Sequence, residues 1–259
     1  MSEGPPRGMA ADSQIKAMNL VQPPQPTTEA DVLDHLDQKY YQAVPASSLS
    51  EHVLIAARDR IYKDFLKYCE PQATDTILDV GVSDIVNDAA NLIERKYPYP
   101  DRITAAGLGG AGAFRAAFPK VTYSQIGANQ PLPFPDKHFD IATSNAVLEH
   151  VGSRANQQLF VGEMIRVAQR VFIVVPNRWF PVEHHTGIPL AHYWERSFRL
   201  ACGLLGCSEW TQEANLIQMS RRSLTALAPD AMPWRTGYTG IPLGPFSSNL
   251  FILFGISKP

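Results

Sequence analysis

The stretch LDVGVSDIVND, residues 78–88, decides the fold class of this chain. LDVG is a short apolar run that predicts a buried strand, and the polar residues after it predict a turn and then a helix near residues 86–97. A strand, a loop and a helix in this order commonly bind a nucleotide or another cofactor at the loop. Such loops usually carry two or three glycines, whereas this one carries only Gly81. This loop has no GxGxxG or Walker pattern, so a dinucleotide or a nucleoside triphosphate is not expected at it.

The alternation of strands and helices continues along the chain. RVFIVVPN (170–177) has almost no polar alternation, which is typical of a strand that is covered on both faces. The tail differs, because 234–244 and 247–258 are two β-like runs joined by a turn, which we interpret as a closing pair with one antiparallel strand. The pattern predicts a mainly parallel sheet with helices on both faces. Its other strands are expected at 102–107, 121–126 and 138–145, and its later helices at 112–119 and 153–169.

Length and composition indicate one globular domain. The chain has 259 residues, and its hydrophobic content of 45% is sufficient for a large core. Residues 1–28, rich in proline and polar residues, predict a flexible leader, and 29–259 a single domain that begins with a helical segment at 29–70. The two cysteines near the end of the chain, Cys202 and Cys207, are expected in a core rather than in a redox or metal site.

Charge and hydropathy exclude several classes of protein. The formal net charge of −2 argues against a nucleic-acid-binding surface. No apolar run approaches the roughly 20 residues that span a bilayer, and the N-terminus lacks the pattern of a secretory signal. We therefore expect a cytoplasmic protein with reduced thiols, and a homo-oligomer is compatible with the sequence.

Two longer segments carry a resemblance to a known family. LPFPDKHFDIATSNAVLEHVGS (132–153) and RVFIVVPNRWFPVEHHTGIPL (170–190) resemble the small-molecule class I S-adenosylmethionine-dependent methyltransferases, of the type 11 group. The resemblance extends over roughly 180 residues, which suits one domain. It implies a Rossmann-like sheet of seven strands whose last strand is antiparallel. It also implies S-adenosylmethionine as the cofactor and a sugar, a lipid or a secondary metabolite as the small-molecule acceptor.

The resemblance also assigns residues to the cofactor. Two positions at which the family carries acids are glycines here, namely Gly109 or Gly110 after the second strand and Gly127 after the third. This departure leaves an alternative open, a methyltransferase-like protein with impaired catalysis that serves as a binding or scaffold module. A nicotinamide-dependent oxidoreductase is less favoured, because the glycine fingerprint for a diphosphate is absent from the loop after the first strand. The residues that the resemblance places at the cofactor are Asp79, Gly81, Val82, Ser83, Leu108, Gly109, Gly127 and Asn145.

Polar side chains are unusually dense after the fourth and fifth strands. We assign acid–base roles to His150 and His185, since imidazole titrates near neutral pH. The alternative is that these side chains only cap, pack or order a lid. A metal site built from Glu183, His184, His185 and His192 is considered but not predicted, because their spacing matches no compact zinc motif. The residues that we assign to the acceptor are Arg178, Trp179, Glu183 and His184.

Overall fold

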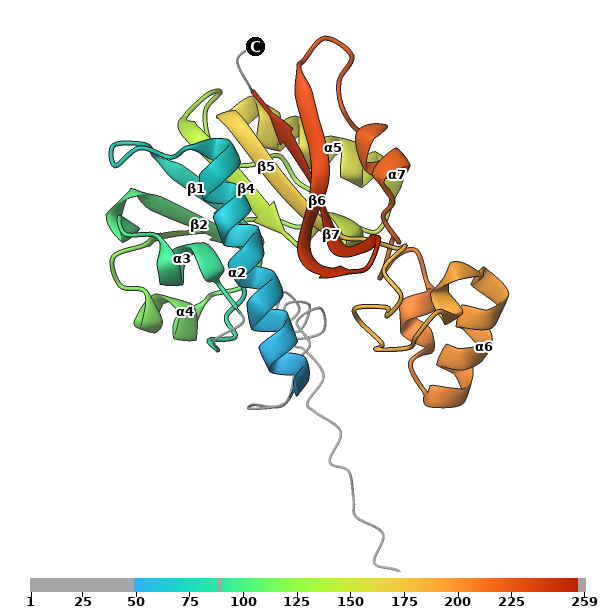
Figure 1. Ribbon diagram of the computed structural model, residues 1–259. Helices are drawn as coiled ribbons and strands as arrows, with labels where there is room; N and C mark the ends of the chain where they lie inside the picture. Colours follow the sequence, from blue (N-terminus) through green and yellow to red (C-terminus); the bar gives the residue numbers. More distant parts are fainter. Residues whose placement is uncertain (1–48, 88–89, 256–259) are drawn as a thin grey trace, which may run out of the picture.

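The computed structural model describes residues 49–87 and 90–255 of the chain (Figure 1). A seven-stranded sheet in the order β3-β2-β1-β4-β5-β7-β6 forms its centre. The predicted leader, the first part of the helical segment 29–70 and the last residues of the chain lie outside the described residues. The strands are β1 (Ile77–Val80), β2 (Ile103–Gly107), β3 (Thr122–Gln125), β4 (Phe139–Asn145), β5 (Ala168–Pro176), β6 (Trp234–Leu243) and β7 (Phe246–Phe254). The α-helices are α2 (Leu49–Cys69), α3 (Leu92–Lys96), α4 (Gly112–Ala117), α5 (Arg154–Val167), α6 (Glu195–Leu205) and α7 (Arg221–Thr225), with 3₁₀ helices η1 (Pro100–Arg102), η2 (Leu148–His150), η3 (Ala191–Tyr193) and η4 (Ser208–Thr211).

Strand directions confirm the predicted fold class. β1 to β5 pair in parallel, and β7 lies antiparallel to both β5 and β6. The last strand is therefore inserted between β5 and β6 with its direction reversed. This is the Rossmann-like arrangement of about seven strands expected from the sequence.

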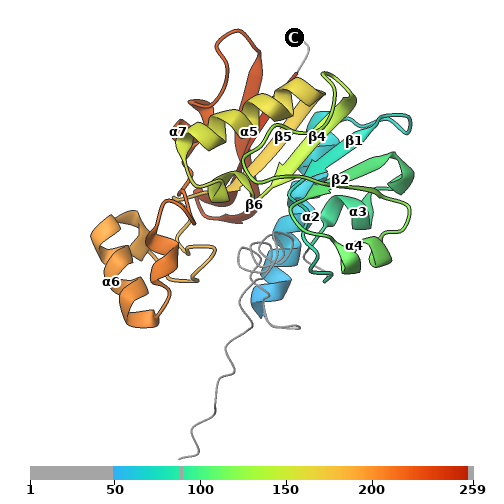
Figure 2. The ribbon, with the colours of Figure 1, turned by 180° about the vertical axis from the view of Figure 1, so that it is seen from behind.

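Helices cover both faces of the sheet, as Figures 1 and 2 show from opposite sides. One core packs α5 and α7 against the sheet, and the other packs α2, α3 and α4 against its opposite face. β5 contributes to both cores: Val171, Ile173 and Val175 point into the first, and Phe172 and Val174 into the second. The apolar run at 170–177 is thus buried on both faces, which confirms the prediction made from its lack of alternation.

The segment around α6 projects from the sheet and has a small core of its own (Figure 1). Phe198, Cys202 and Trp210 are buried in this core, and Cys207 packs against it. Cys202 and Cys207 therefore lie where the sequence placed them, in apolar packing. Within the described residues, no helix is both long and apolar enough to cross a membrane.

The helix after β1 is shorter than predicted. α3 begins at Leu92 instead of near residue 86, because Asn91 has a left-handed backbone (φ 51°) and its side chain bonds the loop before it. The amide of Asn91 donates to the carbonyl of Ser83 and accepts from the backbone N–H of the same residue. These bonds satisfy the loop backbone without a helix.

Two further local features depart from simple helix periodicity. The carboxylate of Asp84 does not cap the helix after β1 but accepts from the backbone N–H of Phe114 at 2.8 Å, in the first turn of α4. The hydroxyl of Ser83 instead accepts from Ile85 within the loop. In α5, Leu159 is 38% exposed, because the buried face of the helix is formed by Gln157, Val161, Met164 and Val167.

Candidate functional site

The carboxyl ends of β3, β2, β1 and β4 lie next to one another along one edge of the sheet. From β1 the chain adds β2 and β3 on one side of the sheet, and then continues with β4 and β5 on the other side. Open α/β sheets bind ligands at such a switch point, which here lies between β1 and β4. Gly81 lies there with φ 97°, and a Cβ atom at this position would be 2.2 Å from Cγ2 of Val147. The loop after β1 is therefore in direct contact with the segment after β4, and only glycine fits.

The loop after β1 is held by its own side chains and by β2. The backbone N–H groups of Gly81 and Val82 both donate to the carbonyl of Ala106, at 2.8 and 3.2 Å. Val82 and Ser83 are buried. This places Gly81, Val82 and Ser83 at the switch point of the sheet, where backbone hydrogen bonds hold the start of the loop against β2.

Two carboxyl groups lie beneath this loop. Burial raises the pKa of Asp79, in β1, to about 7. Burial, together with the neighbouring charge of Asp79, raises the pKa of Glu94 in α3 well above its usual value. The pair therefore holds protons near neutral pH, and both carboxyl oxygens of Glu94 are buried without a hydrogen-bond partner among the described residues.

The ends of β2 and β3 carry no carboxylate. Leu108 and Gly109 follow β2, and their carbonyl groups accept hydrogen bonds from Gln125 and from the hydroxyl of Tyr123, respectively. Gly127 follows β3, and a Cβ atom there would lie 2.8 Å from the side chain of Gln130. The three positions thus line the same edge as Gly81, and the carbonyl groups of Leu108 and Gly109 are already bonded to neighbouring side chains of the protein.

The end of β4 differs from those of β2 and β3, because it carries buried polar atoms that have no hydrogen-bond partner among the described residues. Asn145 ends the strand, and its side-chain oxygen is buried with no hydrogen-bond partner among the described residues. Glu149, in η2, is only 1% exposed, and both of its carboxylate oxygens are likewise without a partner in the described part of the chain. Buried polar atoms are normally bonded, so this concentration of unpaired groups marks a site.

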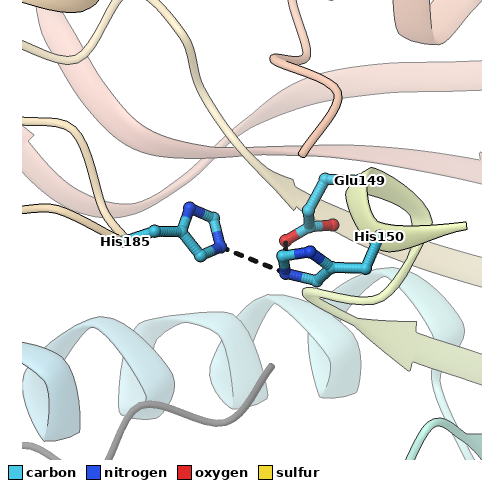
Figure 3. Close-up of side chains that lie close together, drawn as sticks. All are labelled: Glu149, His150 and His185. Carbon is cyan, nitrogen blue, oxygen red and sulfur yellow. Dashed lines mark hydrogen bonds and ion pairs between the residues drawn. The ribbon is translucent and has the colours of Figure 1, made fainter. Parts of the chain in front are cut away.

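His150 and His185 meet next to Glu149, although 35 positions separate them in the sequence (Figure 3). Their Nε2 atoms are 3.1 Å apart, and Oε1 of Glu149 is 4.0 Å from Nε2 of His150. Nδ1 of His150 lies 2.7 Å from the carbonyl oxygen of Asn215. Nδ1 of His185 lies 2.9 Å from Oε1 of Glu183. The structure thus brings together the two residues to which the sequence assigned acid–base chemistry.

Burial controls the protonation of this group. It lowers the pKa of His150 to about 3, with a further contribution from His185, and so His150 is neutral at pH 7. Burial raises the pKa of Glu149 to about 7. Burial also favours protonation of Glu183, but hydrogen bonds from His185 and Thr186 outweigh it and lower the pKa of Glu183 to about 2. The site therefore contains one firmly ionised carboxylate and a second that titrates near neutral pH.

A small hollow lies beside the histidine pair and is partly open to solvent, and its volume of about 290 Å³ includes part of that open space. Its lining includes three of the four residues predicted to bind the acceptor: Arg178, Glu183 and His184. Trp179 does not line it; its ring is 49% exposed and packs against Tyr193 with the ring centroids 5.8 Å apart. Nε of Arg178 is buried without a hydrogen-bond partner among the described residues.

The four residues first considered as metal ligands do not converge. The Nε2 atom of His192 lies 3.0 Å from the carbonyl oxygen of Phe180, and the ring of His184 packs against the ring of that phenylalanine. The sequence analysis did not identify Trp210, whose ring stacks on that of His185 at 4.9 Å, or Asn215. Both come from the segment after α6, and no local motif connects them to the site.

Comparison with known proteins agrees with this architecture. A family model described as "Methyltransferase domain" matches residues 108–171. That range begins after β2 and extends through β4, η2 and α5, so it includes Asn145, Glu149 and His150. No curated protein matches the chain in a sequence search.

Several solved structures share the fold at low sequence identity. The methyltransferase in complex with the Trm112 methyltransferase activator from Haloferax volcanii has a TM-score of 0.53 at 12% identity, over 85% of this chain and 97% of that one. N-methyltransferase NodS from Bradyrhizobium japonicum WM9, in complex with S-adenosyl-L-homocysteine, has 0.52 at 12%, over 86% and 96%. An S-adenosylmethionine-dependent methyltransferase from Thermotoga maritima has 0.52 at 13%, over 86% and 97%. The protein therefore has the fold of the class I S-adenosylmethionine-dependent methyltransferases, which confirms the resemblance seen in the sequence.

Proposed function

We propose that the protein transfers a methyl group from S-adenosylmethionine to a small-molecule acceptor bound in the hollow beside His185. The observation that carries this proposal is the position of that hollow. It opens next to the β4 exit of a methyltransferase fold, and Glu149 in its lining lies within the range that the family model matches. The proposed acceptor is a sugar, a lipid or a secondary metabolite, for which the polar side chains of the lining offer hydrogen-bond partners.

The cofactor is proposed to lie across the switch point between β1 and β4. Gly81, Val82 and Ser83 would contact its methionine part, because the lack of a Cβ at Gly81 allows close approach of the backbone. Asn145 offers an unpaired buried oxygen that can accept from the ammonium group of the cofactor. Leu108, Gly109 and Gly127 would flank the ribose and the adenine, and Asp79 would support the loop from below.

Methyl transfer from a sulfonium requires mainly the alignment of the nucleophile, the methyl group and the sulfur. Where the nucleophile loses a proton, a positioned base contributes typically 10²–10⁴-fold. We assign that role to His185, whose Nδ1 is held by Glu183, while neutral His150 orients it. Arg178, Glu183 and His184 would contact the acceptor, and Trp179 would act only through its contact with Arg178.

Calorimetric titration with S-adenosylmethionine and S-adenosylhomocysteine tests the cofactor. We expect saturable binding of one molecule per chain. Transfer of labelled methyl groups to a panel of small hydroxyl and amine acceptors then tests the reaction. His185→Ala should lower that rate by about 10²–10⁴-fold without changing cofactor affinity. The absence of heat and of any thermal shift at millimolar cofactor would overturn the proposal.

A second candidate function is a methyltransferase-like binding or scaffold module with impaired catalysis. It is favoured by one observation: the ends of β2 and β3 lack carboxylates, and the carbonyls of Leu108 and Gly109 are already bonded within the protein. A missing partner for a buried polar group of a ligand costs about 1–3 kcal/mol. Tight cofactor binding by the natural protein would exclude this alternative.

A further inference from the structure

The geometry points to a binding site for a divalent transition-metal ion formed by Glu149, His150 and His185. One ligand atom of each residue lies within 4.8 Å of the others, and this is the one such group found in the described part of the chain. Figure 3 shows the three side chains pointing toward one another from η2 and from the loop after β5. This group differs from the one considered in the sequence, with which it shares only His185.

A hydrogen bond at Nδ1 of each histidine orients its ring so that Nε2 faces the proposed metal site. A carbonyl oxygen can only accept, so Nδ1 of His150 must donate its proton to Asn215. The ionised carboxylate of Glu183 likewise accepts from Nδ1 of His185. In the neutral imidazoles, both Nε2 atoms therefore carry lone pairs, and these face each other at 3.1 Å. Two lone pairs at this distance repel each other unless a cation lies between them.

The distances are close to those of a metal site. Zinc binds imidazole nitrogen at about 2.0–2.1 Å, so two tetrahedral nitrogen ligands lie about 3.3 Å apart. The two Nε2 atoms are already 3.1 Å apart, and Oε1 of Glu149 is 4.0 Å from Nε2 of His150. All three ligand atoms lie within 4.8 Å of one another, so the carboxylate of Glu149 must approach the two nitrogens to complete a three-ligand set.

Glu149 supplies an independent argument. Its carboxylate is 1% exposed, and neither oxygen has a hydrogen-bond partner among the described residues. Burial of an ionised carboxylate is costly unless the group is paired or coordinates a metal. A cation held by the two imidazoles would compensate that cost directly.

The hydrogen-bond partners of the two histidines also match those of known metal ligands. Histidines that bind metals usually donate the other ring proton to a carboxylate or a backbone carbonyl, which fixes the ring orientation and raises its basicity. His185 and Glu183 form the first type of contact, and His150 and Asn215 form the second. The hydroxyl and backbone N–H of Thr186 in turn hold Glu183, at 2.8 and 2.7 Å.

The ligand types select the metal. Imidazole suits zinc, copper, iron and nickel, whereas magnesium and calcium prefer sites built entirely from oxygen. Two histidines and one carboxylate leave a fourth position open in a tetrahedral zinc site. Glu149 and His185 both line the hollow, so that open position is accessible to water or to a bound molecule. Metal binding does not depend on the proposed methyl transfer. A metal ion on Nε2 of His185 would occupy the lone pair that the base needs, so the base role proposed for His185 applies to the metal-free protein.

Metal titration of the full-length protein tests the inference. The protein is stripped with a chelator and titrated with Zn²⁺ against a chromophoric competitor, without S-adenosylmethionine. We expect one Zn²⁺ per chain, and with Co²⁺ a visible absorption spectrum of a low-symmetry site. Glu149→Gln and His185→Ala should each weaken binding at least tenfold, and Glu183→Gln about 10–100-fold.

His192→Gln is the matched control. His192 lines the same hollow, but its ring bonds to Phe180 and does not face the other ligands. Its substitution should leave Zn²⁺ affinity unchanged, and circular dichroism of each variant checks that it folds. Failure of the natural protein to bind Zn²⁺ stoichiometrically would overturn the inference, as would equal binding by His185→Ala. A proton shared between the two Nε2 atoms would then explain their contact.

The result is separable from that of the cofactor experiment. S-adenosylmethionine is titrated into metal-free protein, and Zn²⁺ is titrated into cofactor-free protein. A chain that binds Zn²⁺ but not the cofactor would retain the metal site and refute the methyltransferase proposal. A chain that binds the cofactor but not Zn²⁺ would retain the methyltransferase proposal and refute the metal site.

Discussion

The edge formed by β1, β2 and β3 and the hollow beyond β4 and β5 use their polar groups in opposite ways. At the edge, Asn91, Asp84, Gln125 and Tyr123 bond to the backbone of the loops, which leaves those loops rigid and internally satisfied. In the hollow, Glu149 and Arg178 keep buried polar atoms without hydrogen-bond partners among the described residues. Unpaired buried groups are costly, and they persist where a ligand pairs with them. Glu94 beneath the loop after β1 and Asn145 at the end of β4 also keep unpaired buried atoms, so the contrast holds for the loops of the edge and not for the side chains under them.

The largest expected effect tests the rigidity of the edge. Gly81→Ala would place Cβ 2.2 Å from Val147 in a backbone with φ 97°. Both the overlap and the left-handed backbone disfavour it, so we expect a loss of about 2–4 kcal/mol in the free energy of unfolding. Urea denaturation measures this. Gly110→Ala is the control, because its Cβ would meet no atom within 4 Å, and an equal loss in both variants would contradict the argument.

The second prediction contrasts the pH dependence of the two regions. Burial raises the pKa of Asp79 to about 7, so the folded protein holds a proton that the unfolded chain releases, and stability falls as the pH rises from about 4 to 7. In Asp79→Asn, the free energy of unfolding should fall by about 2 kcal/mol less over this pH range than in the natural protein. Thermal denaturation at pH 5 and pH 8 measures it, and an unchanged pH dependence in the variant would refute it.

Glu183 in the hollow should have the opposite effect on the pH dependence of stability, which it should make rise with pH. Its pKa is lowered to about 2, so its contribution is present above the unfolded value and is lost as the pH falls toward 2. Glu183→Gln should therefore destabilise the protein at pH 7 and have a smaller effect at pH 3. The same denaturation series detects this, and a larger effect at pH 3 would contradict the stabilisation of the ionised carboxylate by its hydrogen bonds from His185 and Thr186.

A third, smaller effect concerns the missing carboxylates at the edge. Gly110→Asp places a carboxylate in open space after β2, where it can accept from ribose hydroxyl groups. One such hydrogen bond contributes about 1 kcal/mol, so the affinity for S-adenosylmethionine should rise about fivefold. Calorimetry measures the change against Gly110→Ala, and an identical affinity in both variants would show that this position does not face the ribose.

The smallest effect is expected at Trp179. This side chain lies outside the hollow and contacts the guanidinium of Arg178 at 5.0 Å. An exposed cation–π contact contributes about 0.5–1 kcal/mol, so Trp179→Ala should raise KM for the acceptor less than about fivefold and leave kcat unchanged. A large fall in kcat would instead place Trp179 at the reacting atoms.

The sequence by itself determined the order of strands and helices, the reversed last strand and the resemblance to class I methyltransferases. These follow from periodicity and local motifs, which depend on residues close together in the chain. The predicted helix start after β1 was wrong because a side-chain contact overrides the periodicity of the sequence there. Asn91 delays the start of α3, and Asp84 bonds to the first turn of α4 instead of to the helix that follows it.

Only the tertiary structure decided what the histidines contact. The sheet places the exits of β4 and β5 side by side, and the segment after α6 returns to add Asn215 and Trp210. His150 and His185 meet through that folding, and their tautomers are set by partners 65 and 2 positions away in the chain. A spacing rule cannot encode such a group, because its members are brought together by packing of the whole domain.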